Sequence, residues 1–163
     1  MLKSAALTID DHLNSPALGS RLCDADLALL DTEGNQVQLV VSDGLSAAAV
    51  MHNVPPLVDV LNEALTARGI RCGRPIVVLH GRVKIAEQIA ALVQCDLLIL
   101  LIGERPGGDV LAARSLSAYL VYRPPTSSEP SAACEYTVVS KPAFTSAIAP
   151  RSPTGPAPIT TAR

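Results

Sequence analysis

Apolar residues form short unbroken runs along the chain, and several of these runs end in polar residues and glycine. The longest run covers residues 97–102 and lies between Asp96 and Gly103. A run of this length, rich in branched aliphatic side chains and closed by turn residues, is typical of a strand buried on both faces. Ligands of open parallel sheets bind beyond the carboxyl ends of the strands, so we expect chemistry in the loop after Ile102. An ordinary strand-to-helix turn is the alternative, because glycine and proline occur in most loops.

Three further strands are predicted, at residues 37–41, 76–79 and 115–122. Helical spacing of apolar residues separates the first three strands from one another. Strands that alternate with helices indicate right-handed crossovers and a parallel sheet covered by helices. The predicted fold class is therefore α/β, with a mostly parallel sheet, flanking helices and a Rossmann-like doubly wound arrangement.

The helices between these strands are predicted from apolar residues three or four positions apart. One helix begins at Leu45, and we expect Pro55 and Pro56 to interrupt it before a second helical stretch at 57–65. Proline lacks the backbone N–H that a helix interior needs, which is the reason for this expectation. Another helix is predicted at 85–92, with its apolar residues on one face.

The composition divides the chain into three segments. Residues 1–36 are a mixed segment of loops and short helical stretches, and residues 37–123 carry the regular alternation of strands and helices. Residues 124–163 are rich in Pro, Ser, Thr and Ala and have few aliphatic positions at a regular period. Such a composition cannot bury a core, so we predict a largely disordered tail.

Composition and charge narrow the function classes. Hydrophobic residues make up 48% of the chain but aromatic residues only 2%, so the core must be built from aliphatic side chains. The net charge of -2 provides no basic field for a polyanion, and few side chains are present that could stack on bases. Nucleic-acid binding is therefore not expected. The sequence also lacks the dinucleotide fingerprint and the phosphate loop of common nucleotide-binding proteins.

The cysteines and the apolar runs indicate the cellular compartment of the protein. The four cysteines have no zinc-ligand spacing, so free, reduced thiols and a cytoplasmic location are expected, and no metal site is predicted (Cys23, Cys72, Cys95 and Cys134). The start of the chain turns acidic before any apolar stretch long enough for a secretory signal. No apolar run is long enough to cross a bilayer, so no membrane partner is expected.

Three polar loops follow the predicted parallel strands, at residues 42–44, 80–83 and 103–107. The carboxyl ends of parallel strands meet at one edge of a sheet, so these loops should form a ligand-binding crevice there. Glu104 needs hydrogen-bond donors if it is buried, because an unpaired carboxylate costs several kcal/mol. A surface pair with a nearby base is the alternative for Glu104.

Two other polar residues of these loops have ordinary alternatives. His80 is a candidate acid or base because of its place at the predicted edge, and a simple loop residue is the alternative. Asp43 is expected to cap the helix that follows it, through the backbone N–H groups of the first turn.

Five segments of the chain resemble, in order and spacing, the small (light) subunit of ethanolamine ammonia-lyase. They are the segments at 13–22, 41–46 (Val-Ser-Asp-Gly-Leu-Ser), 80–89 (His-Gly-Arg-Val-Lys-Ile-Ala-Glu-Gln-Ile), 100–107 (Leu-Leu-Ile-Gly-Glu-Arg-Pro-Gly) and 115–122. The resemblance implies an adenosylcobalamin-dependent carbon–nitrogen lyase that converts ethanolamine to acetaldehyde and ammonia. It also implies a hetero-oligomer with a large subunit, in the cytoplasm and within a bacterial microcompartment.

The resemblance carries three cofactor contacts onto this chain, namely Val83, Glu104 and Cys134. Residues 37–123 would then be a cobalamin-binding core, and the small subunit would cover a cofactor whose substrate site and catalytic residues belong to the large subunit. Compared with the family, we expect the chain to be truncated at its N-terminus and to diverge after Cys134.

Two alternatives accompany this hypothesis. The chain could be a non-catalytic remnant or binding module that no longer supports turnover. It could also be a stand-alone enzyme that uses Glu104 and His80 as acid and base, although no motif supports that chemistry.

Overall fold

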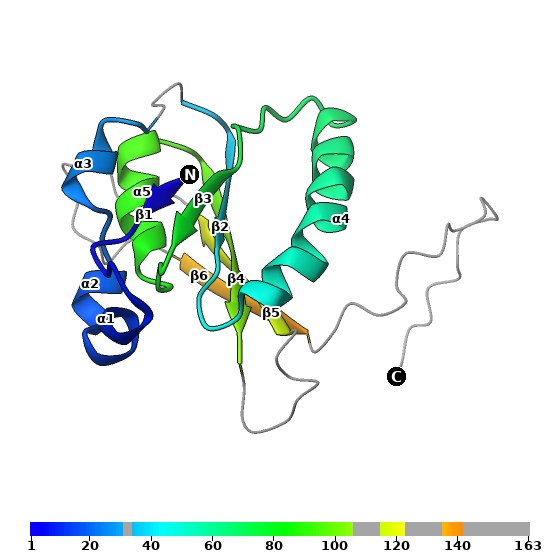
Figure 1. Cartoon of the computed structure of the whole chain (residues 1–163). Coiled ribbons are helices and arrows are strands. Elements are labelled where there is room, and N and C mark those ends of the chain that lie inside the picture. Colours follow the sequence, from blue (N-terminus) through cyan, green and yellow to red (C-terminus); the bar gives the residue numbers. More distant parts are fainter. Residues whose placement is uncertain (31–33, 106–114, 123–134, 142–163) are drawn as a thin grey trace, which may run out of the picture.

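A single sheet runs through the part of the chain that the structure describes (Figure 1). The structure is a computed structural model that describes residues 1–30, 34–105 and 115–122, and the backbone of residues 135–141. Within these residues six strands lie in the order β1 (Leu2–Lys3), β3 (Ile76–Leu79), β2 (Val37–Ser42), β4 (Leu97–Glu104), β5 (Ser115–Tyr122) and β6 (Glu135–Lys141). The first four strands of this order pair in parallel, and the last two join antiparallel. The prediction of a mostly parallel sheet is confirmed.

Strand β4 lies at the centre of the sheet, between β2 and β5. Successive side chains of β4 lie on opposite faces of the sheet. Leu98 and Leu100 belong to the apolar cluster on one face, whereas Leu101 belongs to the cluster on the other. All three are at most 1% exposed, which confirms a strand buried on both faces. The strand extends two residues beyond the predicted range, to Glu104.

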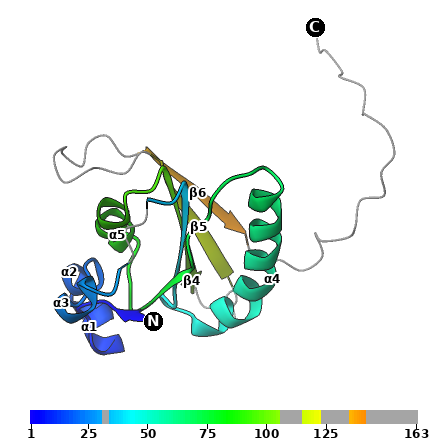
Figure 2. The same cartoon turned by 90° about the horizontal axis from the view of Figure 1, so that it is seen from above.

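Helices cover both faces of the sheet (Figure 2). One face is covered by α4 (Ala47–Thr66), and the other by α5 (Ile85–Val93) together with α1 (Ile9–Asn14), α2 (Pro16–Gly19) and α3 (Asp24–Leu27). The apolar side of α5 supplies Ile85, Ile89 and Val93 to the larger cluster. The doubly wound arrangement expected from the sequence is therefore present.

The prediction that Pro55 and Pro56 interrupt the first long helix is wrong. Helix α4 continues through both prolines and bends along its length (Figure 1). Proline removes hydrogen bonds and bends a helix, but packing on the sheet can outweigh that cost. Val54 is buried against the sheet just before the prolines, and the side chain of Asn53 donates a hydrogen bond of 2.8 Å to the carbonyl of Ala49.

The structure adds two strands to those predicted from the sequence. Strand β1 has only two residues, too few for a period to show. Strand β6 lies inside the segment 124–163 that we predicted as a tail, and it pairs with residues 116–122 of β5. The remaining residues of that segment lie outside the described part of the chain, so their predicted disorder stays a prediction.

Candidate functional site

The loops after β2, β3 and β4 come together at one edge of the sheet, as the strand pattern predicts. The backbone N–H of Leu45 donates to the carbonyl of Gly103 at 2.9 Å. The hydroxyl of Ser42 donates to the carbonyl of Gly81 at 3.0 Å, so the second loop joins the first. The third loop contributes Gly103, Glu104 and Arg105, whereas its residues 106–107 lie outside the described part of the chain.

A cavity of about 300 Å³ lies at this edge. It is lined by residues of the three loops and of the N-terminal helices (His12, Pro16, Ser20, Gly44, Leu45, Arg82, Val83, Lys84, Ile102, Gly103 and Glu104). The structure therefore brings together two of the three residues that the family resemblance marks as cofactor contacts, Val83 and Glu104. The third, Cys134, lies outside the described residues.

Glu104 is half-buried at the end of β4. Burial raises the pKa of its carboxyl group above the ordinary value, and a hydrogen bond from the Tyr119 side chain partly opposes that rise. The pKa of Tyr119 is raised as well, by burial first and then by the charge and hydrogen bond of Glu104. The donor that a buried Glu104 requires is thus a tyrosine hydroxyl of the neighbouring strand.

Two glycines allow the first and third loops to approach each other. A Cβ atom on Gly103 would meet the carbonyl oxygens of Ser46 and Asp43, the latter at 2.6 Å. Gly44 has a φ of +52°, and a Cβ atom there would collide with the Gly103 carbonyl and the side chain of Ile102. The absence of side chains at these two positions therefore lets the two loops pack backbone against backbone.

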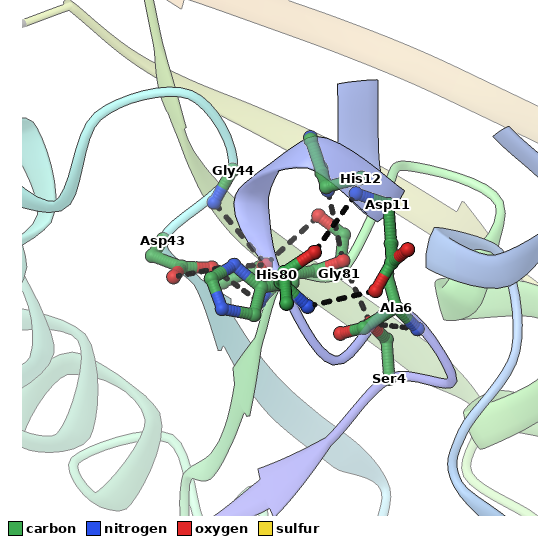
Figure 3. A network of polar contacts seen from close by, with 10 residues as sticks. Ser4, Ala6, Asp11, His12, Asp43, Gly44, His80 and Gly81 are labelled. Carbon is green, nitrogen blue, oxygen red and sulfur yellow. Dashed lines mark hydrogen bonds and ion pairs between the residues drawn. The ribbon is translucent and has the colours of Figure 1, made fainter. Parts of the chain in front are cut away.

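His80 has an unusual backbone conformation at the centre of a polar network (Figure 3). Its φ of 54° lies in the left-handed region, which side chains other than glycine seldom adopt. The backbone N–H of His80 donates to Oδ1 of Asp43 at 2.7 Å, and its carbonyl accepts from Oγ of Ser4 at 2.8 Å. A second donor, Nδ1 of His12, lies 2.9 Å from the same carbonyl.

This network corrects the expected role of Asp43. The side chain that caps α4 is Ser46, which accepts a hydrogen bond of 3.1 Å from the backbone N–H of Ala49. The carboxylate of Asp43 instead holds the backbone of His80. An N-cap lies directly before its helix, and α4 begins at Ala47, so Asp43 is too early in the chain to cap it.

His80 and Glu104 do not form the acid and base pair considered above. His80 is absent from the described residues that line the cavity, whereas Glu104 lines it. The imidazole Nδ1 of His80 lies 3.7 Å from Oδ2 of Asp43. Among the described residues this buried atom has no hydrogen-bond partner. The loop conformation of His80, rather than an exposed catalytic imidazole, is its observed contribution to the site.

Two residues of the site were not identified from the sequence, Tyr119 and His12. Tyr119 pairs in register with Leu100, four residues before Glu104 on β4, so strand alignment alone does not join the two side chains. His12 is 68 residues from His80 along the chain, and no short-range spacing relates them.

The described part of the chain contains no group of three His, Cys, Asp or Glu side chains placed to hold a metal ion. The cysteines described there, Cys23, Cys72 and Cys95, are free thiols. Burial raises the pKa of Cys95 to about 11, so its thiol stays protonated at neutral pH.

Comparison with known protein families gives one match that covers most of the chain. Residues 1–142 match the family model described as ethanolamine ammonia-lyase light chain (EutC). The matched region includes the N-terminal helices, the sheet through β6 and every described residue that lines the cavity.

Proposed function

Because the chain belongs to the ethanolamine ammonia-lyase light-chain family, we propose that it helps to bind adenosylcobalamin at an interface with the large subunit. The complex would convert ethanolamine to acetaldehyde and ammonia. The observation that supports this proposal is the joint presence of Val83 and Glu104 in one cavity beyond the strand ends.

The size of the cavity suits one part of the cofactor. Ligand pockets range from about 300 to 1,000 Å³. A cavity of about 300 Å³ is at the small end of this range, and cobalamin is much larger than an ordinary small ligand. The cavity can therefore receive an edge of the corrin ring with one or two of its amide side chains. The large subunit must cover the rest of the cofactor.

The chemistry of the lining residues also fits a corrinoid. The carboxylate of Glu104 can accept hydrogen bonds from the amide N–H groups at the corrin edge, and the Val83 side chain offers an apolar contact. Gly44 and Gly103 allow the first and third loops to pack closely against each other. Cys134 is the third proposed contact.

In this proposal the small subunit binds and orients the cofactor and excludes water from it. When bound, adenosylcobalamin supplies radical chemistry through homolysis of its cobalt–carbon bond. The large subunit supplies the substrate site and the catalytic residues, so the isolated small subunit is inactive. We place the complex in the cytoplasm, within a bacterial microcompartment. None of the helices described here is long and apolar enough to span a bilayer.

Reconstitution with a cognate large subunit tests the proposal. The chain is expressed alone and together with the large subunit, and ammonia release from ethanolamine is measured with and without adenosylcobalamin. We expect activity only in the mixture that contains the cofactor. Co-purification without turnover would instead favour a remnant that binds its partner but no longer supports catalysis. Turnover by the isolated chain without cobalamin would contradict both functions.

A further inference from the structure

The N-terminal helices form one wall of the cavity. His12 of α1, Pro16 of α2 and Ser20 line it together with Val83 and Glu104. The segment that precedes the regular strand and helix pattern is therefore part of the site.

A reciprocal pair of contacts joins α1 to the loop after β3. The His12 side chain contacts the carbonyl of His80 through Nδ1 at 2.9 Å. In return, Nε and Nη2 of Arg82 donate to the carbonyl of His12 at 3.0 and 2.7 Å. A carbonyl oxygen can only accept a hydrogen bond, so Nδ1 of His12 carries the proton. His12 is 3% exposed, which protects the pair from water.

The carbonyl that His12 contacts belongs to His80, the residue of this loop with the left-handed backbone conformation. A left-handed conformation is unfavourable for a residue with a Cβ atom, so it persists only where surrounding contacts enforce it. For His80 these contacts come from Asp43 on one side and from Ser4 and His12 on the other (Figure 3). From this turn the backbone leads through Gly81 and Arg82 directly to Val83.

We propose that His12 is a positioning residue of the cofactor site. Its imidazole holds the His80 carbonyl and thereby sets the course of the loop that presents Val83 to the cavity. This inference rests on the proposed function, because it assigns His12 a role in cobalamin binding.

Three substitutions of His12 distinguish the effect of its hydrogen bond to the His80 carbonyl from the effect of its side-chain volume. In His12→Asn the amide nitrogen occupies the place of Nδ1 and can still donate to His80. In His12→Gln the amide nitrogen occupies the place of Nε2, and in His12→Ala the donor is lost. Each variant is assembled with the large subunit, and adenosylcobalamin binding is measured by equilibrium dialysis, with detection by visible absorbance. Turnover as a function of cofactor and ethanolamine concentration is recorded in parallel.

We expect the Kd for adenosylcobalamin to rise about tenfold in His12→Ala and His12→Gln, whereas His12→Asn stays within about twofold of the unsubstituted chain. The KM for ethanolamine should not change. His52→Ala, which alters an exposed histidine of α4, is the matched control. Val93→Ala, a core substitution, controls for a general loss of stability.

Equal affinities of His12→Asn and His12→Gln would overturn the inference, even if His12→Ala does not fold. An equally large rise in Kd for Val93→Ala would overturn it as well. A complex whose unsubstituted small subunit binds no adenosylcobalamin would instead reject the proposed function, so the two failures are distinguishable.

Discussion

The carboxyl group of Glu104 is partly buried and accepts a hydrogen bond from the side chain of Tyr119. Burial favours its neutral form, whereas the hydrogen bond from the Tyr119 hydroxyl favours the charged form and orients the carboxyl group. A carboxylate oriented in this way keeps acceptor capacity for a ligand. We therefore propose that Glu104 binds the cofactor and does not act as a catalytic acid.

Glu104→Ala is expected to weaken adenosylcobalamin binding by the assembled complex about tenfold or more, because hydrogen bonds to a charged group contribute about 1.5–3 kcal/mol each. Equilibrium dialysis measures the affinity, and circular dichroism checks that the fold is retained. Glu63→Ala, an exposed position of α4, is the control. Unchanged affinity of the Glu104 variant would remove this residue from the proposed site.

The ends of β2, β3 and β4 form the site because hydrogen bonds to backbone groups hold together the loops that follow them. Gly103 belongs to β4, yet its Cα faces the carbonyl groups of the loop before α4. Glycine is needed there for space, whereas at Gly69 it is needed for its φ of +68° alone, since nothing lies within 4 Å of a Cβ atom placed on it.

Gly103→Ala should lower the free energy of unfolding by about 3 kcal/mol, because the added methyl group must displace backbone atoms. Gly69→Ala should cost only about 1 kcal/mol, the typical cost of the left-handed conformation. Urea titration of both variants measures the difference. Equal stability of the two would show that the loops can move apart to accommodate the methyl group at position 103.

At the scale of the whole molecule, the sheet separates two apolar clusters, and the N-terminal segment packs into the larger one. Leu2 and Leu22 from this segment lie in the same cluster as Ile85 of α5 and Leu100 of β4. Stability and site geometry are consequently coupled, since the segment that carries α1 and α2 is anchored to the main core at Leu2 before them and at Leu22 after them.

The unfolding free energy should carry a pH dependence that comes from Glu104. Its pKa is higher in the folded chain than the ordinary 4.5, so the folded state binds more protons than the unfolded state between these two values. The stabilisation is fully present below about 4.5 and is lost as the pH rises through the folded pKa. Glu104→Gln removes this loss, so the variant should gain stability relative to the unsubstituted chain as the pH rises.

Denaturant unfolding at several pH values from about 4 to 7 measures this difference. Glu63→Gln is the exposed control on α4, and its difference from the unsubstituted chain should not follow that of Glu104→Gln. A difference between Glu104→Gln and the unsubstituted chain that stays constant with pH would contradict the assignment.

The sequence alone determined the elements whose patterns are local. The strands at 37–41, 76–79 and 97–102, and the meeting of their loops, follow from apolar runs and from the geometry of parallel sheets. This is why the sequence pattern alone places Val83 and Glu104 at one edge of the sheet. The course of α4 through Pro55 and Pro56 could not be predicted in this way, because packing on the sheet outweighed a local preference.

The tertiary structure alone decided which distant side chains complete the site. His12 contacts a carbonyl 68 residues away, and Asp43 binds the backbone of a residue 37 positions away instead of capping the nearby helix. Such contacts depend on how separate elements pack, and no periodicity along the chain records them. The pattern of residues therefore established where the cavity lies, whereas the packing of the N-terminal segment on the sheet decided what holds it in shape.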